Sequence, residues 1–338
     1  MTLNRRIYQV ILLLAGLWVV VELASRLAAE ILWFQEVGYL EVLLLRLKTQ
    51  GLLGVIPTAI SAVFLMGNLT LARRLQHPLE ETQSPISEAL FASVNLKKIG
   101  KNYQIPAVKS QIAFPWLLLA VFGLSSIAIL TIIYCGYLAA NSLTYFGVSG
   151  NLPAPPVQFG IESIQQIVVQ LFSNWWELGL LLGTILALTI KPEFGLRTIA
   201  LLLSLAIGLI AASRWTKVLH YFYSTNFNTT DPLFNQNISF YVFIFPILEF
   251  LSFWLTVVFL YSLVSGALTY LLSANCLSQG RFYGFSRSQQ RHLYGLGAAF
   301  MLAIALLYWL GRYALLYSRG DVTYGADYAD VTVRLPCY

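Results

Sequence analysis

Charged residues are scarce in this sequence of 338 residues. Asp, Glu, Lys and Arg together make up 11% of the chain, whereas 58% of the residues are hydrophobic. An ordinary soluble domain carries about a quarter charged residues, so this chain has too few of them to cover itself with a water-facing surface. The composition therefore excludes a soluble protein and predicts an integral membrane protein.

Cysteine and histidine are also rare. The three cysteines fall in a predicted membrane span, a predicted cytoplasmic loop and the exterior tail, so no two share a compartment in which a disulfide forms. They are Cys135, Cys276 and Cys337. The three histidines are isolated, with no cysteine or second histidine at the spacing of metal ligands. We therefore expect no disulfide, no metal site and no cofactor.

Motifs for catalysis and for nucleotide binding are missing as well. The chain contains no Walker A loop, no G-x-S-x-G turn and no Rossmann glycine signature. Its net charge of +6 comes from Lys and Arg residues scattered between hydrophobic segments. We expect a non-enzymatic protein that does not bind nucleic acid. Its partners are the lipid bilayer and other membrane or extracytoplasmic proteins.

Long apolar runs are what the sequence contains instead. A helix needs roughly 20 mostly apolar residues to cross the hydrocarbon of a bilayer. Segments of this kind lie at about 7–29, 51–72, 112–140, 171–190, 194–213, 247–272 and 293–316. The sequence thus predicts an all-α bundle of seven transmembrane helices over residues 1–318. The fourth and fifth segments have the shortest apolar cores, and a re-entrant hairpin is the alternative for that pair.

The basic residues indicate how the bundle is oriented. With the N-terminus inside, the inner loops receive most of the 21 Lys and Arg residues, as the positive-inside rule requires. This predicts a cytoplasmic N-terminus and an extracytoplasmic C-terminus, with an uncleaved first span; a cleaved signal peptide is the alternative. The expected location is the bacterial plasma membrane, and another internal energy-transducing membrane is the alternative.

Two stretches outside the spans have the apolar periodicity of amphipathic helices. The stretch at about 161–172 follows a Pro-rich exterior turn and is expected to lie on the outer leaflet. The stretch at about 86–98 belongs to the largest inner loop and precedes Lys101 and Lys109. It fits either a solvated basic loop or a segment held at an anionic leaflet.

Five charged residues near the outer ends of the spans are candidates for a polar cluster: Glu22, Arg26, Glu177, Glu249 and Arg312. Charges inside a membrane are costly unless they are paired or wetted, so they are functional candidates by default. Glu22 and Arg26 have the spacing of a helical ion pair. Either the five side chains converge on a water-accessible cavity, which favours transport, or each lies separately among the head groups, which favours an anchor.

Several long motifs carry a family resemblance. They are Trp33-Phe-Gln-Glu-Val-Gly-Tyr39 with Gln50, Asp231-Pro-Leu-Phe-Asn-Gln-Asn-Ile-Ser-Phe-Tyr-Val-Phe243 with Pro246, Arg291-His-Leu293, Arg312-Tyr-Ala-Leu-Leu-Tyr-Ser-Arg-Gly320 and Gly325-Ala-Asp-Tyr-Ala-Asp-Val-Thr-Val-Arg-Leu-Pro336. Together they resemble a bacterial multi-pass family catalogued only as uncharacterised protein family 0182. The matching positions are Asp231, Pro232, Phe240, Tyr241, Pro246, Arg312, Tyr313, Tyr317, Arg319, Gly320, Asp330 and Pro336.

The resemblance implies a multi-pass protein of the plasma membrane and supplies no activity. Members generally continue into a further span and a large extracytoplasmic domain, so residues 319–338 are expected to begin an extracytoplasmic region in a truncated or split product. Asn237 stands where an acidic residue is usual, which weakens any cation site built with Asp231. Asp231-Pro232 is typical of a turn, and Pro246 of the first turn of a helix.

Two hypotheses for the function follow from the sequence. The first is a non-enzymatic membrane scaffold or anchor for an extracytoplasmic domain. The alternative is a transporter or channel that uses the five outer charges.

Overall fold

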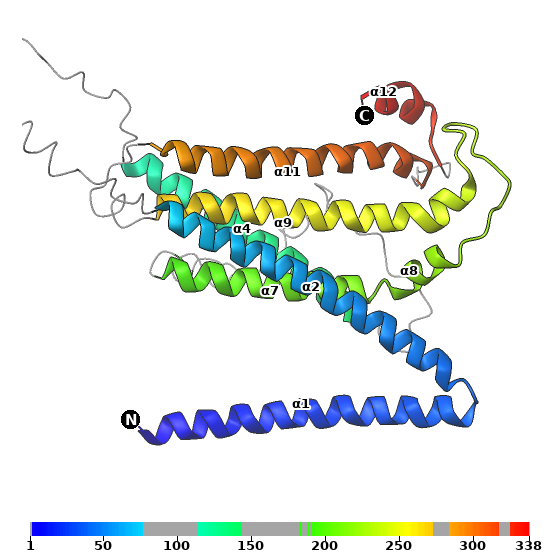
Figure 1. The fold of residues 1–338 in the computed structure, drawn as a ribbon, viewed down its shortest axis with the longest axis horizontal. Coiled ribbons are helices and arrows are strands. Elements are labelled where there is room, and N and C mark those ends of the chain that lie inside the picture. The colour runs from blue at the N-terminus through cyan, green and yellow to red at the C-terminus, as the bar shows by residue number, and fades with distance from the viewer. Residues whose placement is uncertain are drawn as a thin grey trace, which may run out of the picture. The chain divides into compact units, whose positions relative to one another are not determined.

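The computed structural model describes residues 2–76, 114–143, 183, 188, 191–272, 284–317 and 325–337, and the regular elements among them are helices, with no named strand (Figure 1). The long helices are α1 (Thr2–Glu36), α2 (Leu40–Gln76), α4 (Phe114–Leu143), α7 (Pro192–Ala212), α9 (Phe245–Leu271) and α11 (Arg287–Ala314). The short elements are α8 (Trp215–Phe222), the π-helix η1 (Phe240–Ile244), the 3-10 turn η2 (Leu315–Tyr317), the π-helix η3 (Asp330–Arg334) and α12 (Leu335–Cys337). The chain divides into two compact units, Met1–Leu53 and Gly54–Tyr338.

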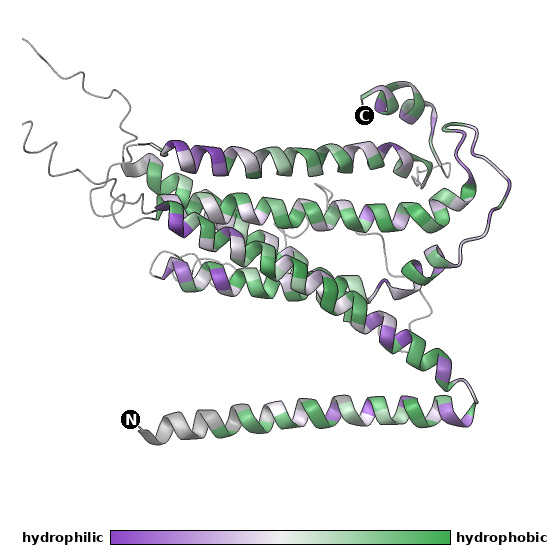
Figure 2. Ribbon diagram, in the orientation of Figure 1, coloured by the Kyte–Doolittle hydropathy of each residue, from purple (hydrophilic) through white to green (hydrophobic). Residues whose placement is uncertain are grey.

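Five helical segments among the described residues are long and apolar enough to cross a membrane. They are Leu40–Gln76, Trp116–Leu143, Pro192–Ala212, Phe240–Leu271 and Arg287–Tyr317. They overlap the predicted spans 51–72, 112–140, 194–213, 247–272 and 293–316, so the helical character of those spans is confirmed. Figure 2 shows hydrophobic residues along the helices and hydrophilic residues gathered at the beginning of α11.

The remaining predicted segments have different outcomes. Helix α1 contains the first predicted span, 7–29. The fourth, 171–190, and both predicted amphipathic stretches lie outside the described residues, apart from Gly183 and Leu188, which are helical. The number of seven crossings and the orientation therefore stay predictions.

The first unit holds α1, a tight turn and the beginning of α2. Gly38 in the turn has a φ of +79°, a left-handed conformation that glycine adopts without a steric penalty. Before the turn, the rings of Trp33 and Phe34 pack edge to face with centroids 4.9 Å apart. After it, the guanidinium of Arg46 lies 3.8 Å from the carboxylate of Glu30. The first family motif thus forms the connection between two helices.

In the second unit, the apolar core is formed chiefly by α4, α7 and α9, with fully buried side chains such as Leu203, Ile207 and Val257. Lipid tails are as apolar as these side chains, so membrane helices are held together by close packing and by interhelical hydrogen bonds. One such bond joins the hydroxyl of Tyr261 in α9 to the carbonyl oxygen of Leu196 in α7 at 2.6 Å. Helices α9 and α11 run side by side (Figure 1).

Glycine makes a close approach between α2 and α7 possible. A Cβ atom on Gly208 would overlap Oγ1 of Thr58 and would stand 2.5 Å from the carbonyl oxygen of Gly54. Small residues at such crossings are typical of membrane helices, because they let two backbones come into direct contact.

Helix α8 was not predicted from the sequence. It follows α7 immediately after Arg214, and none of its eight residues is buried. Tyr221, Phe222 and the adjacent Tyr223 are exposed. So short a helix has little room for a recognisable apolar period, and the sequence merges with the end of the preceding span.

Candidate functional site

The loop between α8 and η1 is built around the carboxylate of Asp231. Its oxygens accept hydrogen bonds from the hydroxyl of Tyr241 at 2.6 Å and, at 2.7–3.1 Å, from the backbone N–H groups of Leu233, Phe234 and Gln236. Partial burial raises the pKa of this carboxyl, but the four hydrogen bonds outweigh burial and hold the pKa below its ordinary value. The predicted turn at this position is confirmed, and the aspartate is its centre.

Asn237 closes the same loop. Its Oδ1 accepts hydrogen bonds from the backbone N–H of Ser239, at 2.9 Å, and from the Ser239 hydroxyl, while its Nδ2 donates to Oδ1 of Asn226. The backbone of Asn237 forms an antiparallel bridge with Thr230. The side-chain amide of Asn237 both accepts and donates hydrogen bonds here, whereas a carboxylate only accepts them. Within the described residues, no three His, Cys, Asp or Glu side chains are placed to hold a metal ion.

Two of the family motifs meet in an aromatic cluster at one end of α9 and α11. Tyr313 of α11 contacts the rings of Phe234 from the loop and of Phe240 and Tyr241 from η1, with centroid distances of 4.9, 5.2 and 6.1 Å. Such aromatic pairs contribute about 0.5–1.5 kcal/mol each beyond the burial of their area. The cluster therefore fixes the Asp231 loop on the end of the helices.

A proline determines the shape of the backbone beside this cluster. Pro246 lies in the first turn of α9, as predicted. Because a proline ring clashes with the carbonyl group four residues earlier, the preceding turn widens into η1, where the N–H of Phe245 donates to the carbonyl of Phe240. The ring of Phe245 then stacks on Tyr317 with centroids 6.0 Å apart. The π-helix η3 stands in the same position before Pro336.

Arg312 is surrounded by aromatic rings. Its guanidinium carbon lies 4.8 Å from the ring centroid of Tyr313, 5.0 Å from that of Trp309 and 6.0 Å from that of Phe234. Its Nη2 donates a 3.0 Å hydrogen bond to the Tyr313 hydroxyl, and its Nε is buried without a hydrogen-bond partner in the described structure. No carboxylate among the described residues forms an ion pair with this cation.

Glu249 near the beginning of α9 acts on two basic groups that the sequence did not connect with it. Arg214 is buried, with its guanidinium carbon 5.8 Å from the ring centroid of Phe250. Burial lowers the pKa of Arg214 to about 10, and the charge of Glu249 opposes that decrease. Burial and the charge of Arg214 lower the pKa of Lys217, and the charge of Glu249 again opposes that decrease. These two basic residues are additions to the candidate site that their position just after a span did not reveal.

Four of the five charges predicted to form an outer cluster lie among the described residues, namely Glu22, Arg26, Glu249 and Arg312. Nε of Arg26 pairs with Oε1 of Glu22 at 2.8 Å, and both side chains are exposed, at 77% and 46%. The helical ion pair is thus confirmed, and an exposed pair of this kind contributes little to stability. Glu177 lies outside the described residues. Convergence of all five charges on one cavity stays a prediction.

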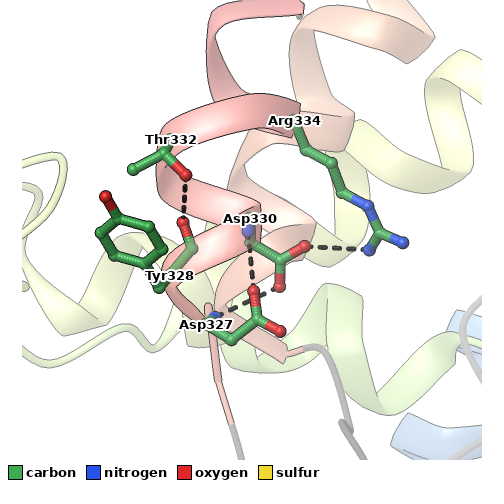
Figure 3. A network of polar contacts seen from close by, with 5 residues as sticks. All are labelled: Asp327, Tyr328, Asp330, Thr332 and Arg334. Carbon is green, nitrogen blue, oxygen red and sulfur yellow. Dashed lines mark hydrogen bonds and ion pairs between the residues drawn. The ribbon is translucent and has the colours of Figure 1, made fainter.

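The tail motif forms a helix N-terminus closed by two aspartates, as Figure 3 shows. Oδ1 of Asp327 accepts the N–H of Asp330 at 2.7 Å, and Oδ2 of Asp330 accepts the N–H of Asp327 at 3.3 Å. This exchange has the pattern of a capping box. The other oxygen of Asp330 accepts a 2.9 Å hydrogen bond from Arg334. Asp330 therefore has a local structural role, and Arg319 and Gly320 lie outside the described residues.

A partly buried chain of hydrogen-bonded polar side chains at the opposite end of the unit was missed. His292 of α11 contacts the hydroxyl of Tyr270 in α9 through Nδ1, at 2.7 Å, and Oδ1 of Asn68 in α2 through Nε2, at 2.8 Å. The amide nitrogen of Asn68 donates to the carbonyl of Ser262 at 3.1 Å. Because Oδ1 of Asn68 only accepts, Nε2 of the imidazole carries the proton and Nδ1 accepts from Tyr270 in the neutral ring.

No metal ligand stands at a suitable spacing from His292 in the sequence, and its hydrogen-bond partners became evident only in the folded structure. Asn68 and His292 are 224 positions apart in the chain, so no spacing rule connects them. The available signal was weaker: each is a polar residue near the end of an apolar span, where a partner on a neighbouring helix is expected.

Comparison with known proteins gives consistent matches. A model of the family described as "Uncharacterised protein family (UPF0182)" matches residues 7–338. A UPF0182 protein of Nostoc sp. is 42% identical over 347 matched positions, gaps included, and the match takes in 98% of this chain and 34% of the relative. A UPF0182 protein of Trichodesmium erythraeum is 38% identical over 326 residues, which cover 95% of this chain and 31% of the relative. The chain thus spans about a third of the length of these relatives. No solved structure matches it.

Proposed function

The chain belongs to the uncharacterised protein family UPF0182, and on that premise we propose that it is a non-enzymatic membrane scaffold that anchors an extracytoplasmic domain. The observation that carries the proposal is the aromatic cluster, in which two family motifs hold a folded loop on the end of apolar helices. The carboxylate of Asp231 is used within the loop, and that of Asp330 within a helix cap. The motif residues thus build a rigid end to the bundle.

Membrane insertion, location and orientation belong to the same proposal. Five apolar helices of sufficient length support insertion. The distribution of Lys and Arg supports a cytoplasmic N-terminus and an extracytoplasmic aromatic cluster, and the proposed location is the bacterial plasma membrane. In the two relatives described above, about two thirds of the length lies outside the matched part, which leaves room for a domain of the kind proposed.

Co-purification with the unmatched part of the Nostoc relative tests the anchor. This part would be produced as a separate polypeptide beside the full chain in one host. Phe227, in the loop and 48% exposed, and Tyr294, near the opposite end of the unit and 72% exposed, offer a matched pair of variants. We expect the wild type and Tyr294→Ala to retain the polypeptide and Phe227→Ala to lose most of it. Retention no greater than that by an unrelated membrane protein would refute the anchor.

Transport is the second candidate, and the polar chain of Asn68, His292 and Tyr270 is the observation that favours it. Polar groups buried between membrane helices often mark proton or ion pathways. Proton and potassium flux into vesicles that contain equal amounts of wild type, Glu249→Ala and Arg312→Ala separates the candidates. Flux that is present in the wild type and lost in both variants would favour transport. Flux that is unchanged in both would count against transport that uses the outer charges.

A further inference from the structure

The side chain of Arg312 lies in an environment that neither membership of the family nor the proposed anchoring role explains. A guanidinium has five N–H donors, yet among the described residues this group makes a single hydrogen bond, to the neutral hydroxyl of Tyr313. Three aromatic rings surround the charge. Rings of this kind orient a cation and favour it energetically, but they leave its charge unneutralised. The described residues supply no anion for Arg312.

The length of α11 places this cation at a particular depth. Arg291 and Arg312 lie on one continuous helix, about 31 Å apart along its axis at a rise of 1.5 Å per residue. The hydrocarbon core of a bilayer is about 30 Å thick. When Arg291 lies at one interface, Arg312 therefore lies at the level of the opposite head groups. Trp309, three residues before Arg312, and Tyr317, five residues after it, are half exposed, and such side chains anchor at that level.

From these observations we propose that Arg312, oriented by Trp309, Tyr313 and Phe234, binds the phosphate group of an anionic phospholipid. A planar guanidinium donates two parallel N–H bonds to phosphate oxygens, which a lysine ammonium does not do. The exposed face of Trp309 packs along the upper acyl chain. The inference rests on the proposed membrane insertion but not on anchoring.

Lipid retention by the purified full chain tests this inference. Protein extracted in mild detergent is titrated with phosphatidylglycerol, with diacylglycerol, which has no phosphate, and with inorganic phosphate, and bound molecules are counted by native mass spectrometry. Wild type is expected to bind phosphatidylglycerol and not diacylglycerol. Arg312→Gln is expected to bind it about tenfold more weakly, since a hydrogen bond to a charged group is lost. Arg291→Gln, the same change at the other end of α11, is expected to match wild type.

The outcomes distinguish a lipid head group from free phosphate, and they test lipid binding separately from membrane insertion. Arg312→Lys is expected to bind with intermediate affinity, because it keeps the charge and loses the planar fork. If inorganic phosphate at equal concentration displaces the lipid, the ligand is a soluble anion and the proposal is overturned. Equal lipid binding by Arg312→Gln and wild type would overturn the proposal too. So would a result in which Arg312→Gln loses a bound protein but retains the lipid. If Arg312→Gln does not fold, the wild-type comparison of phosphatidylglycerol with diacylglycerol decides. A chain that alkaline carbonate removes from membranes would refute membrane insertion instead.

Discussion

Replacement of Gly208 by alanine tests the packing of α2 against α7. The added methyl group would overlap the side-chain oxygen of Thr58 and stand 2.5 Å from the carbonyl oxygen of Gly54. Thr58 cannot simply rotate away, because its hydroxyl donates a 2.7 Å hydrogen bond to that same carbonyl. The carbonyl belongs to the backbone of α2, so relief requires the two helices to separate.

The magnitude follows from three effects. Overpacking a close contact costs about 1–3 kcal/mol, and loss of the Thr58 hydrogen bond costs about 1 kcal/mol more. Alanine in place of glycine favours a helix by about 1 kcal/mol. The expected net result for Gly208→Ala is a decrease of about 1–3 kcal/mol in the free energy of unfolding.

Gly54→Ala is the matched control at the same crossing. A Cβ atom there would lie 3.7 Å from Cβ of Ala212 and 3.9 Å from the carbonyl oxygen of Gly208, which is ordinary contact. Its expected effect is neutral or stabilising by up to about 1 kcal/mol. Reversible unfolding of both variants in mixed micelles, by titration with a denaturing detergent, measures the difference. If Gly208→Ala is as stable as Gly54→Ala, the two helices do not cross at this point.

Three further predictions concern the loop, the polar chain and the orientation. The pKa of folded Asp231 lies below its ordinary 3.8, so its stabilisation of the loop is complete above about pH 4 and lost as the pH falls through the folded value. The protection factors of the loop amides, which are exchange rates corrected for their intrinsic pH dependence, should therefore fall as the pH drops through the folded pKa, and protection factors that do not change with pH would contradict the assignment. Replacement of His292 by Phe leaves buried polar partners unsatisfied and should cost about 1–3 kcal/mol, whereas the same change at exposed His220 should be neutral in the same unfolding assay. In a chain without native cysteines, Asn226→Cys should react with an impermeant maleimide on intact cells and Ser286→Cys should not; the reverse pattern would invert the proposed orientation.

The local features of the candidate site were predictable because they depend on neighbouring residues. Asp231 closes its turn through N–H groups two to five positions ahead of it, and Pro246 acts on the turn just before it. Both appeared in the sequence as familiar local patterns. The ion pair of Glu22 with Arg26 is local in the same sense, since one turn of helix brings the two side chains together.

The surroundings of Arg312 and Glu249 were not predictable in this way. Arg312 was recognised as a charge at the end of a span, but the ring of Phe234 comes from a loop far away in the sequence. Glu249 was grouped with other predicted outer charges, and the structure adds Arg214 and Lys217 to its surroundings. Which basic group lies near which acid depends on how the helices pack, and the positions of the charged residues in the sequence do not reveal that packing.

The sequence by itself determined that helices of membrane-crossing length form and about where they lie, because the requirement for internal backbone hydrogen bonds in an apolar segment acts on each stretch separately. Only the tertiary structure decided which faces of those helices meet. Lipid and protein interior are almost equally apolar, so a span shows no polar stripe that would distinguish its buried face from its lipid-facing one. The contact at Gly208, the chain through His292 and the rings around Arg312 therefore came from the packed helices alone.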